Sequence, residues 1–378
     1  MSCTENDTRQ APPKFGGQRL TGAVGINIVR APYYIALMTY QVTIRQCEAP
    51  LEVQLGQTIL EAALQQGLDY PHNCRAGNCS ACKSRLYSGE VEMSPYSEFA
   101  LSDAEKDSGL ILACRAVPWS NCEIAWLSEE DRIVHPTRSL RCKVHEITHA
   151  THDITVVKLH VLSGGPFDYS AGQFADVVFP GMPSRQYSMA NRPDQSTLEF
   201  HIRAIPNGRV GNFVKSELQT GMPVEVNGPG GTSYLRTKHQ GPILAIAGGS
   251  GLAPIKSIVD TALFDRLTQP IHCYFGVRTE RDMYYEHQFQ TLAAQHSNFK
   301  FIPVFSESAA STRRAGFVTD AVRADFQSLE GFKTYLCGPP PMVEAAQRML
   351  PEMGVLTENI HADAFYTQAE LKAQEIAR

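Results

Sequence analysis

The chain has 378 residues, of which 43% are hydrophobic and 19% charged, and its formal net charge is -5. This length suits two or three domains with a core in each, and the lack of a broad basic field argues against nucleic acid as a partner. The longest apolar runs fall well short of the roughly 20 residues that a membrane-spanning helix needs, so we expect no membrane partner.

The ten cysteines are too few for a disulfide scaffold in a chain of this length, and no signal-peptide pattern opens the sequence. We therefore expect a cytoplasmic protein. Residues 1–38 are rich in Pro, Gly and polar residues and show no period, so we expect a disordered leader to which no function is assigned.

Residues 39–128 have the pattern of a small compact unit. The stretches "YQVTIR" and "LEVQL" predict two strands, and Ile59, Leu60, Ala63 and Leu64 recur at helical spacing before Gly67. The unit carries 6 Lys or Arg against 11 Asp or Glu, so it is acidic. The charged residues 129–138 are interpreted as a linker.

A cysteine-rich loop, "CRAGNCSAC", lies in this unit. It contains Cys74, Cys79 and Cys82, and Cys114 follows after 31 intervening residues. This is the plant-type spacing for a [2Fe-2S] cluster held by four thiolates. Small residues in the loop let backbone N–H groups approach the sulfurs. A structural zinc site is the alternative, although zinc usually takes two closely spaced cysteine pairs.

Residues 139–236 alternate short β-rich runs with Gly and Pro turns, which predicts an antiparallel β-barrel. In "SRQYS", Arg185 offers a cation for phosphates, Tyr187 a ring to lie against a flavin, and Ser188 a hydroxyl for the flavin edge. Gly208 and Gly211 open a helical stretch whose first N–H groups can take a pyrophosphate. Alone, these motifs also fit surface residues and a plain connection.

Residues 237–378 alternate apolar runs with helical segments, which predicts a parallel sheet with helices on its faces. The run "PILAIAGG" leads into Gly248, Gly249, Ser250 and Gly251, and Pro254 stands in the first turn of the next helix. The turn lets the backbone approach a pyrophosphate, but it lacks the G-x-G-x-x-G spacing. A structural tight turn is the alternative.

A second candidate ligand-binding edge follows the run "KTYLCG". Cys337, Gly338 and Pro339 stand at the carboxyl end of this predicted strand, the edge where α/β sheets bind ligands. A packing role for the Cys-Gly pair is the alternative.

Together, over residues 39 to about 370, these motifs resemble the reductase components of bacterial ring-hydroxylating dioxygenases of the naphthalene and benzoate type. The resemblance implies a β-grasp plant-type ferredoxin domain at 39–128, an FAD-binding β-barrel at 139–236 and a Rossmann-like NAD(P)H-binding domain at 237–378. It implies cluster ligands Cys74, Cys79, Cys82 and Cys114, and an FAD site of Arg185, Tyr187, Ser188, His201, Arg203, Gly208, Gly211 and Phe365 of "HADAFY". It implies an NAD(P)H site of Gly248, Gly249, Ser250, Gly251, Pro254, Cys337, Gly338 and Pro339.

Two positions depart from the family pattern. Gly211 stands where many relatives have a Ser or Thr that contacts the FAD pyrophosphate, which leaves only backbone contacts. The acidic residue often found before the terminal aromatic is Asp363 here, and its role is not assigned.

The cofactors fix the order of electron transfer. NADH gives two electrons as a hydride, a [2Fe-2S] cluster takes one at a time, and a flavin can accept two and release one. We therefore expect electrons to pass from NADH to FAD, to the cluster and to a terminal oxygenase, directly or through a separate ferredoxin. No catalytic side chain is expected, and the acidic cluster-bearing unit suggests docking on a basic partner surface.

The motifs also admit alternatives for the partner, the class of protein and the coenzyme. The same modules can supply electrons to a soluble monooxygenase or a biosynthetic dehydrase instead of a dioxygenase. A non-catalytic zinc-binding protein is the alternative to an electron-transfer enzyme. Arg278 and Arg281 can accept the 2'-phosphate of NADPH, whereas Glu280 and Asp282 repel it. The resemblance favours NADH, with NADPH as the alternative, and we expect a monomer.

Overall fold

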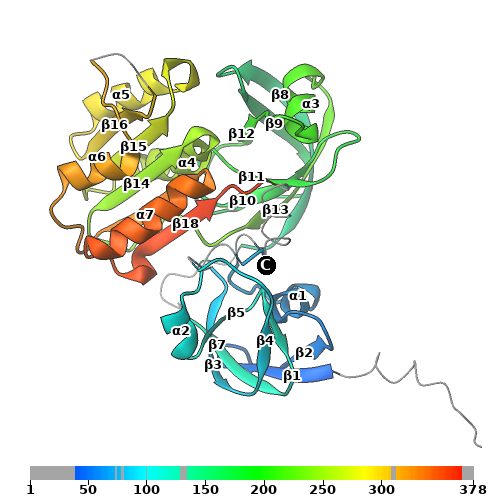
Figure 1. The fold of residues 1–378 in the computed structure, drawn as a ribbon. Coiled ribbons are helices and arrows are strands. Elements are labelled where there is room, and N and C mark those ends of the chain that lie inside the picture. The colour runs from blue at the N-terminus through cyan, green and yellow to red at the C-terminus, as the bar shows by residue number, and fades with distance from the viewer. Residues whose placement is uncertain are drawn as a thin grey trace, which may run out of the picture. The chain divides into compact units, whose positions relative to one another are not determined.

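The computed structural model describes residues 39–72, 75–77, 81–98, 100–127, 133, 135–307 and 312–367. The chain divides into two units, residues 1–37 and residues 38–378, and every described residue belongs to the second. In this unit three main sheets follow one another along the chain, coloured from blue to red in Figure 1.

The first sheet is mixed and has the strand order β2-β1-β7-β3-β5. Its strands are β1 (Thr39–Ile44), β2 (Leu51–Gln54), β3 (Lys83–Ser88), β5 (Leu110–Leu112) and β7 (Cys122–Trp126). β1 and β7 pair in parallel and the other neighbours pair antiparallel. A two-stranded sheet of β4 (Val91–Met93) and β6 (Ala116–Pro118) and the short helix α2 (Asp103–Asp107) complete the domain. This arrangement confirms the expected ferredoxin-like domain.

Helix α1 (Ile59–Gln65) packs its apolar side into the core of this domain. Thr58 and Glu61 form a capping box, in which each side chain accepts a hydrogen bond from the other's backbone N–H. The buried side chains of the helix share one hydrophobic cluster with Val42, Ile44 and Ile124 of the sheet. The start of the helix is thus fixed by its local sequence and its orientation by the core.

The second sheet is antiparallel and has the order β11-β10-β13-β8-β9-β12. Its strands are β8 (Arg138–His149), β9 (Ile154–Ser163), β10 (Phe174–Val178), β11 (Arg185–Ser188), β12 (Thr197–Arg203) and β13 (Pro223–Gly230). A bridge between Met189 and Phe200 joins the two outer strands, so the sheet forms a nearly closed barrel. Helix α3 (Arg209–Ser216) packs on it.

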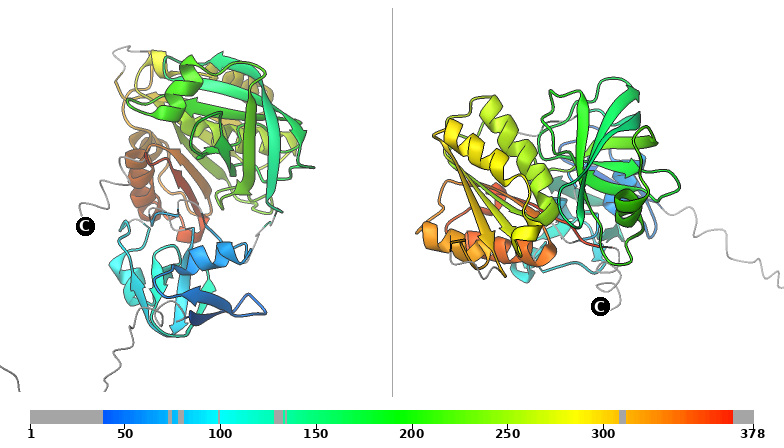
Figure 2. Two further views of the ribbon diagram at one scale, coloured as in Figure 1. Left: turned by 90° about the vertical axis from the view of Figure 1, so that its right-hand side faces the viewer. Right: turned by 90° about the horizontal axis from the view of Figure 1, so that it is seen from above.

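The third sheet is parallel and has the order β16-β15-β14-β17-β18. Its strands are β14 (Ile243–Gly248), β15 (Ile271–Val277), β16 (Phe299–Phe305), β17 (Lys333–Gly338) and β18 (Ile360–Ala364). Helices α4 (Leu252–Phe264) and α5 (Glu286–Gln295) contribute to one buried cluster, and α6 (Val318–Asp325) and α7 (Pro340–Glu352) to another. The expected parallel sheet with helices on both faces is thus confirmed (Figure 2).

Short 3₁₀ turns connect some of these elements: η2 (Gly249–Gly251), η3 (Glu280–Asp282) and η4 (Thr357–Asn359). Strand β18 was not predicted as a strand, because none of its side chains is fully buried and its sequence "IHADA" carries little apolar signal. None of the helices in the described ranges combines the length and the apolar character needed to cross a membrane.

Candidate functional site

Two of the predicted cluster ligands stand at the ends of paired strands. Cys82 directly precedes β3 and Cys114 follows β5, and these strands pair antiparallel. The N–H of Ala113 donates to the carbonyl of Cys82 at 3.1 Å, so the ladder continues to the cysteines. Both cysteines are buried and neither forms a disulfide. Cys74 and Cys79 lie outside the described residues.

Two buried nitrogen atoms beside the cysteine loop have no hydrogen-bond partner in the described part of the chain: Arg115 Nε and His72 Nε2. Arg115 follows Cys114, and its Nη2 donates to the carbonyl of Ala76 in the loop at 2.6 Å. A Cβ added at Gly77 would lie 2.8 Å from Arg115 Nε. His72 Nδ1 donates to the carbonyl of Tyr70 and burial lowers the pKa of His72, so its Nε2 carries no hydrogen to donate. Arg115 Nε is a buried donor without an acceptor, which costs free energy, and an anionic cluster supplies acceptors. These residues fit a [2Fe-2S] cluster.

The backbone carbonyl of Cys82 accepts the last bond of a short hydrogen-bond chain. Ser84 Oγ donates to the carbonyl of Cys82 at 3.2 Å, and Tyr70 Oη lies 2.5 Å from Ser84 Oγ. Tyr70 is fully buried and packs edge-on against Trp126 at 5.2 Å. Burial raises the pKa of Tyr70, so its neutral phenol can donate to Ser84.

The first part of the predicted flavin motif lies on β11. Alternate residues of a strand point to the same face, so Arg185 and Tyr187 share one face and Ser188 points to the other. Arg185 and Tyr187 are half-buried and Ser188 is buried. Burial raises the pKa of Tyr187, which keeps its phenol neutral. A cation beside a neutral ring suits a ligand with phosphates and an aromatic system, as FAD has.

The second part lies where α3 begins, beside the end of β12. Gly208 is the N-cap of α3 and has no side chain with which to cap it, so N–H groups of the first turn remain available to a phosphate. Gly211 is buried in the helix, and a Cβ there would collide with the carbonyl oxygen of Arg203. Close packing of α3 on β12 therefore gives a physical reason for glycine at position 211.

Strand β12 carries two further predicted flavin residues on its outer face. Phe200 and Ile202 point into the barrel core, so Glu199, His201 and Arg203 point out of it. Both ring nitrogens of His201 contact protein groups, Glu199 and a tyrosine hydroxyl. A direct contact of His201 with FAD stays a prediction.

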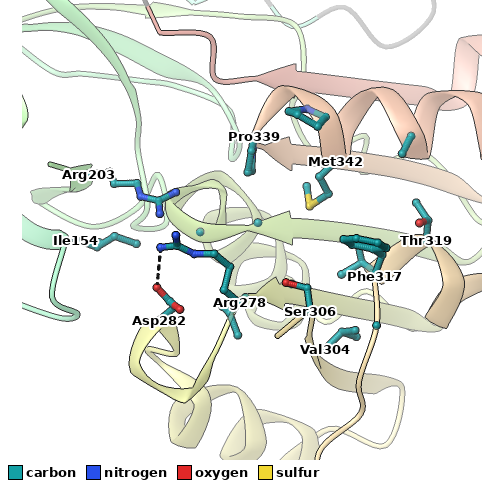
Figure 3. Close-up of a pocket in the computed structure, with 18 of the residues that line it drawn as sticks. Ile154, Arg203, Arg278, Asp282, Val304, Ser306, Phe317, Thr319, Pro339 and Met342 are labelled. Atoms are coloured by element: carbon teal, nitrogen blue, oxygen red, sulfur yellow. Dashed lines mark hydrogen bonds and ion pairs between the residues drawn. The ribbon is translucent and has the colours of Figure 1, made fainter. Parts of the chain in front are cut away.

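A pocket of about 440 Å³ opens at the carboxyl ends of the parallel strands (Figure 3). Gly249, Arg278 and Ser306 contribute to its wall from the ends of neighbouring strands, and Phe317 and Pro339 from the starts of two helices. Arg203 reaches the same pocket from the barrel. The carboxyl edge of a parallel sheet is the usual ligand site of α/β proteins, and this pocket coincides with the predicted NAD(P)H turn.

Glycines let two turns lie against each other at this edge. A Cβ at Gly251 would collide with the carbonyl of Cys337, and one at Gly338, whose φ is +144°, would lie 2.7 Å from the carbonyl oxygen of Gly248. The absence of side chains keeps the backbone at both strand ends close enough to contact a bound dinucleotide. The remaining predicted residues lie in η2 (Ser250), in the first turn of α4 (Pro254) and in the pocket wall (Pro339).

The predicted terminal aromatic is fixed to this edge through its backbone. The N–H of Phe365, just after β18, donates to the carbonyl of Gly338 at 2.9 Å. Cys337 is fully buried, and burial raises the pKa of its thiol well above the usual value. We therefore expect a neutral thiol that does not act as a nucleophile.

A set of paired charges forms one wall of the pocket. Ligand atoms of His152, Asp153 and Asp282 lie within 4.8 Å of one another, a spacing that a cation site would also show. However, Arg203 Nε lies 2.7 Å from Asp153 Oδ2, and Arg278 Nη2 lies 3.1 Å from Asp282 Oδ1. Arginines already balance both carboxylates, so the group is an ion-pair network.

Sequence reasoning missed several residues of the pocket wall. Ser306 follows the end of the predicted strand "KFIPVF", and the carboxyl-edge rule applied to the other strands would have found it. Asp153 and Ile154 come from the barrel and Phe317 from the start of α6, and no local motif marks them.

Comparison with known proteins gives matches along the chain. The 2Fe-2S iron-sulfur cluster binding domain family matches residues 42–118, the oxidoreductase FAD-binding domain family residues 141–234, and the oxidoreductase NAD-binding domain family residues 245–348.

Individual relatives match over most of their length. The ferredoxin–NAD(P)+ reductase component of the naphthalene 1,2-dioxygenase/salicylate 5-hydroxylase systems of Ralstonia sp. is 40% identical, over 84% of this chain and 95% of the relative. The corresponding naphthalene 1,2-dioxygenase component of Pseudomonas putida is 38% identical, over 82% and 94%. The crystal structure of an Amycolatopsis cytochrome P450 reductase has a TM-score of 0.70 and 36% identity, and covers 86% of this chain and 99% of that one.

Proposed function

This chain belongs to the family of ferredoxin–NAD(P)+ reductase components of oxygenase systems, and from that premise we propose that it carries electrons from NADH to a terminal oxygenase that hydroxylates aromatic rings. It is an NAD(P)H-dependent oxidoreductase with FAD-binding and 2Fe-2S domains. The observation that carries the proposal is that the barrel, through Arg203, and the parallel sheet, through Gly249, contribute to one pocket. We propose the cytoplasm, where NADH is supplied, as the place of the reaction.

We propose that the residues of this chain bind the cofactors and orient them for electron transfer. When bound, NADH supplies a hydride, FAD splits its two electrons, and the cluster passes them on singly. We propose that Arg185, Tyr187 and the start of α3 hold FAD, and that the turn at Gly248 and Gly249 holds the dinucleotide. The neutral, buried thiol of Cys337 transfers no proton, so the side chains position the reactants without acid–base chemistry.

The first test of the proposal is spectroscopic. The purified protein should show flavin and iron–sulfur absorption, and anaerobic addition of NADH should bleach both. A colourless protein, or a coloured one that NADH does not bleach, contradicts the proposal. A colourless protein that retains zinc supports the alternative of a non-catalytic metal-binding protein.

We propose NADH as the preferred coenzyme because Asp282 pairs with Arg278 on the pocket wall and so offsets the positive charge of this arginine. Burial acts to raise the pKa of Asp282, but hydrogen bonds from Thr279 and the charge of Arg278 lower it overall, so the carboxylate is ionised at neutral pH. The same carboxylate engages Arg278 at 3.1 Å, which reduces the attraction of that arginine for a 2'-phosphate. A phosphate monoester carries about -1.5 to -2 charge at neutral pH, so the wall disfavours NADPH.

Replacing Asp282 with Asn tests this assignment. Asp282→Asn removes the charge and releases Arg278, and we expect the ratio of kcat/KM for NADPH to that for NADH to rise about tenfold, or about 1.4 kcal/mol. Asp265→Asn, at an exposed position after α4, is the matched control and should leave the ratio unchanged. A wild-type enzyme with the higher kcat/KM for NADPH refutes the proposal.

Two kinds of terminal oxygenase are candidates for the electron acceptor. A ring-hydroxylating dioxygenase is favoured by the two dioxygenase-system relatives, whereas the structural likeness to a P450 reductase favours a monooxygenase as the second candidate. Reconstitution of the purified chain with one oxygenase of each kind, with and without a separate ferredoxin, decides between them through coupled NADH consumption and product formation. A monomer stays our expectation, which size-exclusion chromatography with light scattering tests.

A further inference from the structure

A buried polar network connects β12 of the barrel to the sheet domain. His201 Nε2 lies 3.0 Å from Glu199 Oε1, and His201 Nδ1 lies 3.0 Å from Tyr284 Oη. Tyr284 Oη in turn lies 3.2 Å from the carbonyl oxygen of Gly249, in the turn that lines the pocket. The side chain of His201 has no exposed surface. One continuous chain of contacts thus runs from Glu199 to the dinucleotide turn.

Glu199 is a fixed negative charge at the barrel end of this chain. Burial acts to raise its pKa, but the hydrogen bond from His201, the charge of Lys256 and the hydroxyl of Tyr285 lower it to about 2. The carboxylate therefore accepts hydrogen bonds only, and His201 Nε2 must carry a hydrogen and donate it to Glu199.

The protonation state of His201 Nδ1 decides whether the Tyr284 hydroxyl donates its hydrogen to His201 or to the carbonyl of Gly249. If His201 is neutral, its Nδ1 has no hydrogen and accepts one from Tyr284. The carbonyl of Gly249 then loses the side-chain donor and keeps the backbone N–H of Leu252. If His201 is protonated, Nδ1–H donates to the Tyr284 oxygen, and the hydroxyl hydrogen becomes available to Gly249. The chain from Glu199 to Gly249 is complete only in the protonated form.

We propose that Tyr284 is a positioning residue that anchors the dinucleotide turn at Gly249, and that His201 controls this anchor by competing for the Tyr284 hydroxyl hydrogen. The inference deepens the proposed function and rests on its assignment of the turn to NADH. The C=O and N–H of a trans peptide point in opposite directions. Anchoring the Gly249 carbonyl therefore also fixes the direction of the Ser250 N–H, a backbone donor for the dinucleotide.

The surroundings of His201 set the pH range of this control. The charged and titratable groups around His201 come from four parts of the chain. Strand β12 contributes Glu199 and Arg203, and helix α4 contributes Lys256, which pairs with Asp260. The segment before α5 contributes Tyr284 and Tyr285, and the hairpin between β8 and β9 contributes Asp153. Burial lowers the His201 pKa below 6.5, and Lys256 adds to this, against the opposing effect of Glu199. The anchor therefore forms as pH falls through this lowered pKa and is lost above it.

The test measures NADH binding against pH in the holoenzyme. Anaerobic stopped-flow reduction of the flavin at several NADH concentrations gives the Kd for NADH and the limiting rate separately. For the wild type we expect the Kd to fall about fivefold as the pH falls through the lowered His201 pKa, the effect of roughly one hydrogen bond. In Tyr284→Phe, the Kd should stay at the high-pH value of the wild type at every pH.

Two further variants complete the design. His201→Gln removes the titrating nitrogen and keeps a polar side chain, so its Kd should lose the pH dependence. Tyr274→Phe removes a buried hydroxyl that donates to Asp325 in the same domain, and should keep the wild-type profile. The visible spectrum shows whether each variant retains FAD.

The outcomes separate this inference from the proposed function. If NADH fails to bleach the wild-type flavin, the proposed function is wrong. If NADH bleaches every variant but Tyr284→Phe keeps the pH profile of the wild type, the positioning role of Tyr284 and its control by His201 are both wrong, and the proposed function stands. If the wild-type Kd does not change with pH, the control by His201 is refuted.

Discussion

Arg115, a cation beside the cysteine loop, offers the first prediction at the residue scale. Its guanidinium binds the loop carbonyl of Ala76 and keeps a buried Nε donor. Because reduction adds one negative charge to a [2Fe-2S] cluster, a nearby cation stabilises the reduced form. Arg115→Gln should therefore lower the midpoint potential of the cluster by about 60 mV, equivalent to about 1.4 kcal/mol for one electron.

The control for this prediction is a second arginine of the same domain. Arg85 donates to the carbonyl of Ser108, and Arg85→Gln removes the same charge without touching the loop. Redox titration followed by electron paramagnetic resonance measures both variants. An equal shift in the two would mean that Arg115 acts only through the net charge of the domain, and an unchanged potential in Arg115→Gln would refute the role.

Some site residues could be predicted from their spacing in the sequence, whereas others come together only in the folded chain. The cysteines were predictable because thiolate spacing in a loop is a local property, and the structure brings Cys82 and Cys114 to paired strand ends. His201 and Tyr284 are separated by 83 positions in the chain, and nothing in either segment indicates the contact. Their partnership depends on the packing of two domains, which the sequence pattern of one element does not encode.

At the scale of elements, the packing of α3 on β12 leads to a prediction about Gly211. A Cβ at this position would meet the backbone of Arg203 and Ala204, and backbone atoms cannot move aside as a flexible side chain can. Gly211→Ala should therefore shift the start of α3 and cost about 1–3 kcal/mol of stability. We expect a lower thermal midpoint and weaker FAD retention on gel filtration.

Lys215→Ala is the matched change on the exposed side of α3. It should leave both readouts near the wild-type values. Normal FAD retention and stability in Gly211→Ala would contradict the packing argument and would mean that the helix can adjust at this point.

The elements that could be predicted from the sequence share one property, a strong period of apolar residues. Strands β14, β15 and β17 are continuous apolar runs that end in turns, and buried parallel strands have this pattern. β18 lacks it, since its place is fixed by backbone pairing with β17 along the edge of the sheet. The inward side chains Ile360, Ala362 and Ala364 pack on the neighbouring core, but two of the three are alanines, which leave little apolar signal in the sequence.

At the scale of the whole molecule, the uneven charge predicts how the chain meets its electron acceptor. Residues 39–128 carry 6 basic against 11 acidic side chains, a net of -5, whereas the rest of the chain is close to neutral. Attraction to a basic protein partner should weaken in salt, and we expect the rate of reduction of that partner to fall several-fold between about 50 and 300 mM salt. Ferricyanide, a small anion, should show no such fall, and a salt-independent rate with the protein partner would contradict the docking mode.

The outward face of β12 has a consequence for how such chains can be recombined. Three separate families match along the sequence, which invites the exchange of one module at a time between relatives. Yet Glu199, His201 and Arg203 on this strand meet Lys256, Tyr284 and the pocket of the next domain. A chimera joined between β13 and β14 would give these side chains foreign partners and leave buried charges unmatched. The barrel and the parallel sheet are therefore a matched pair, to be exchanged together as one block.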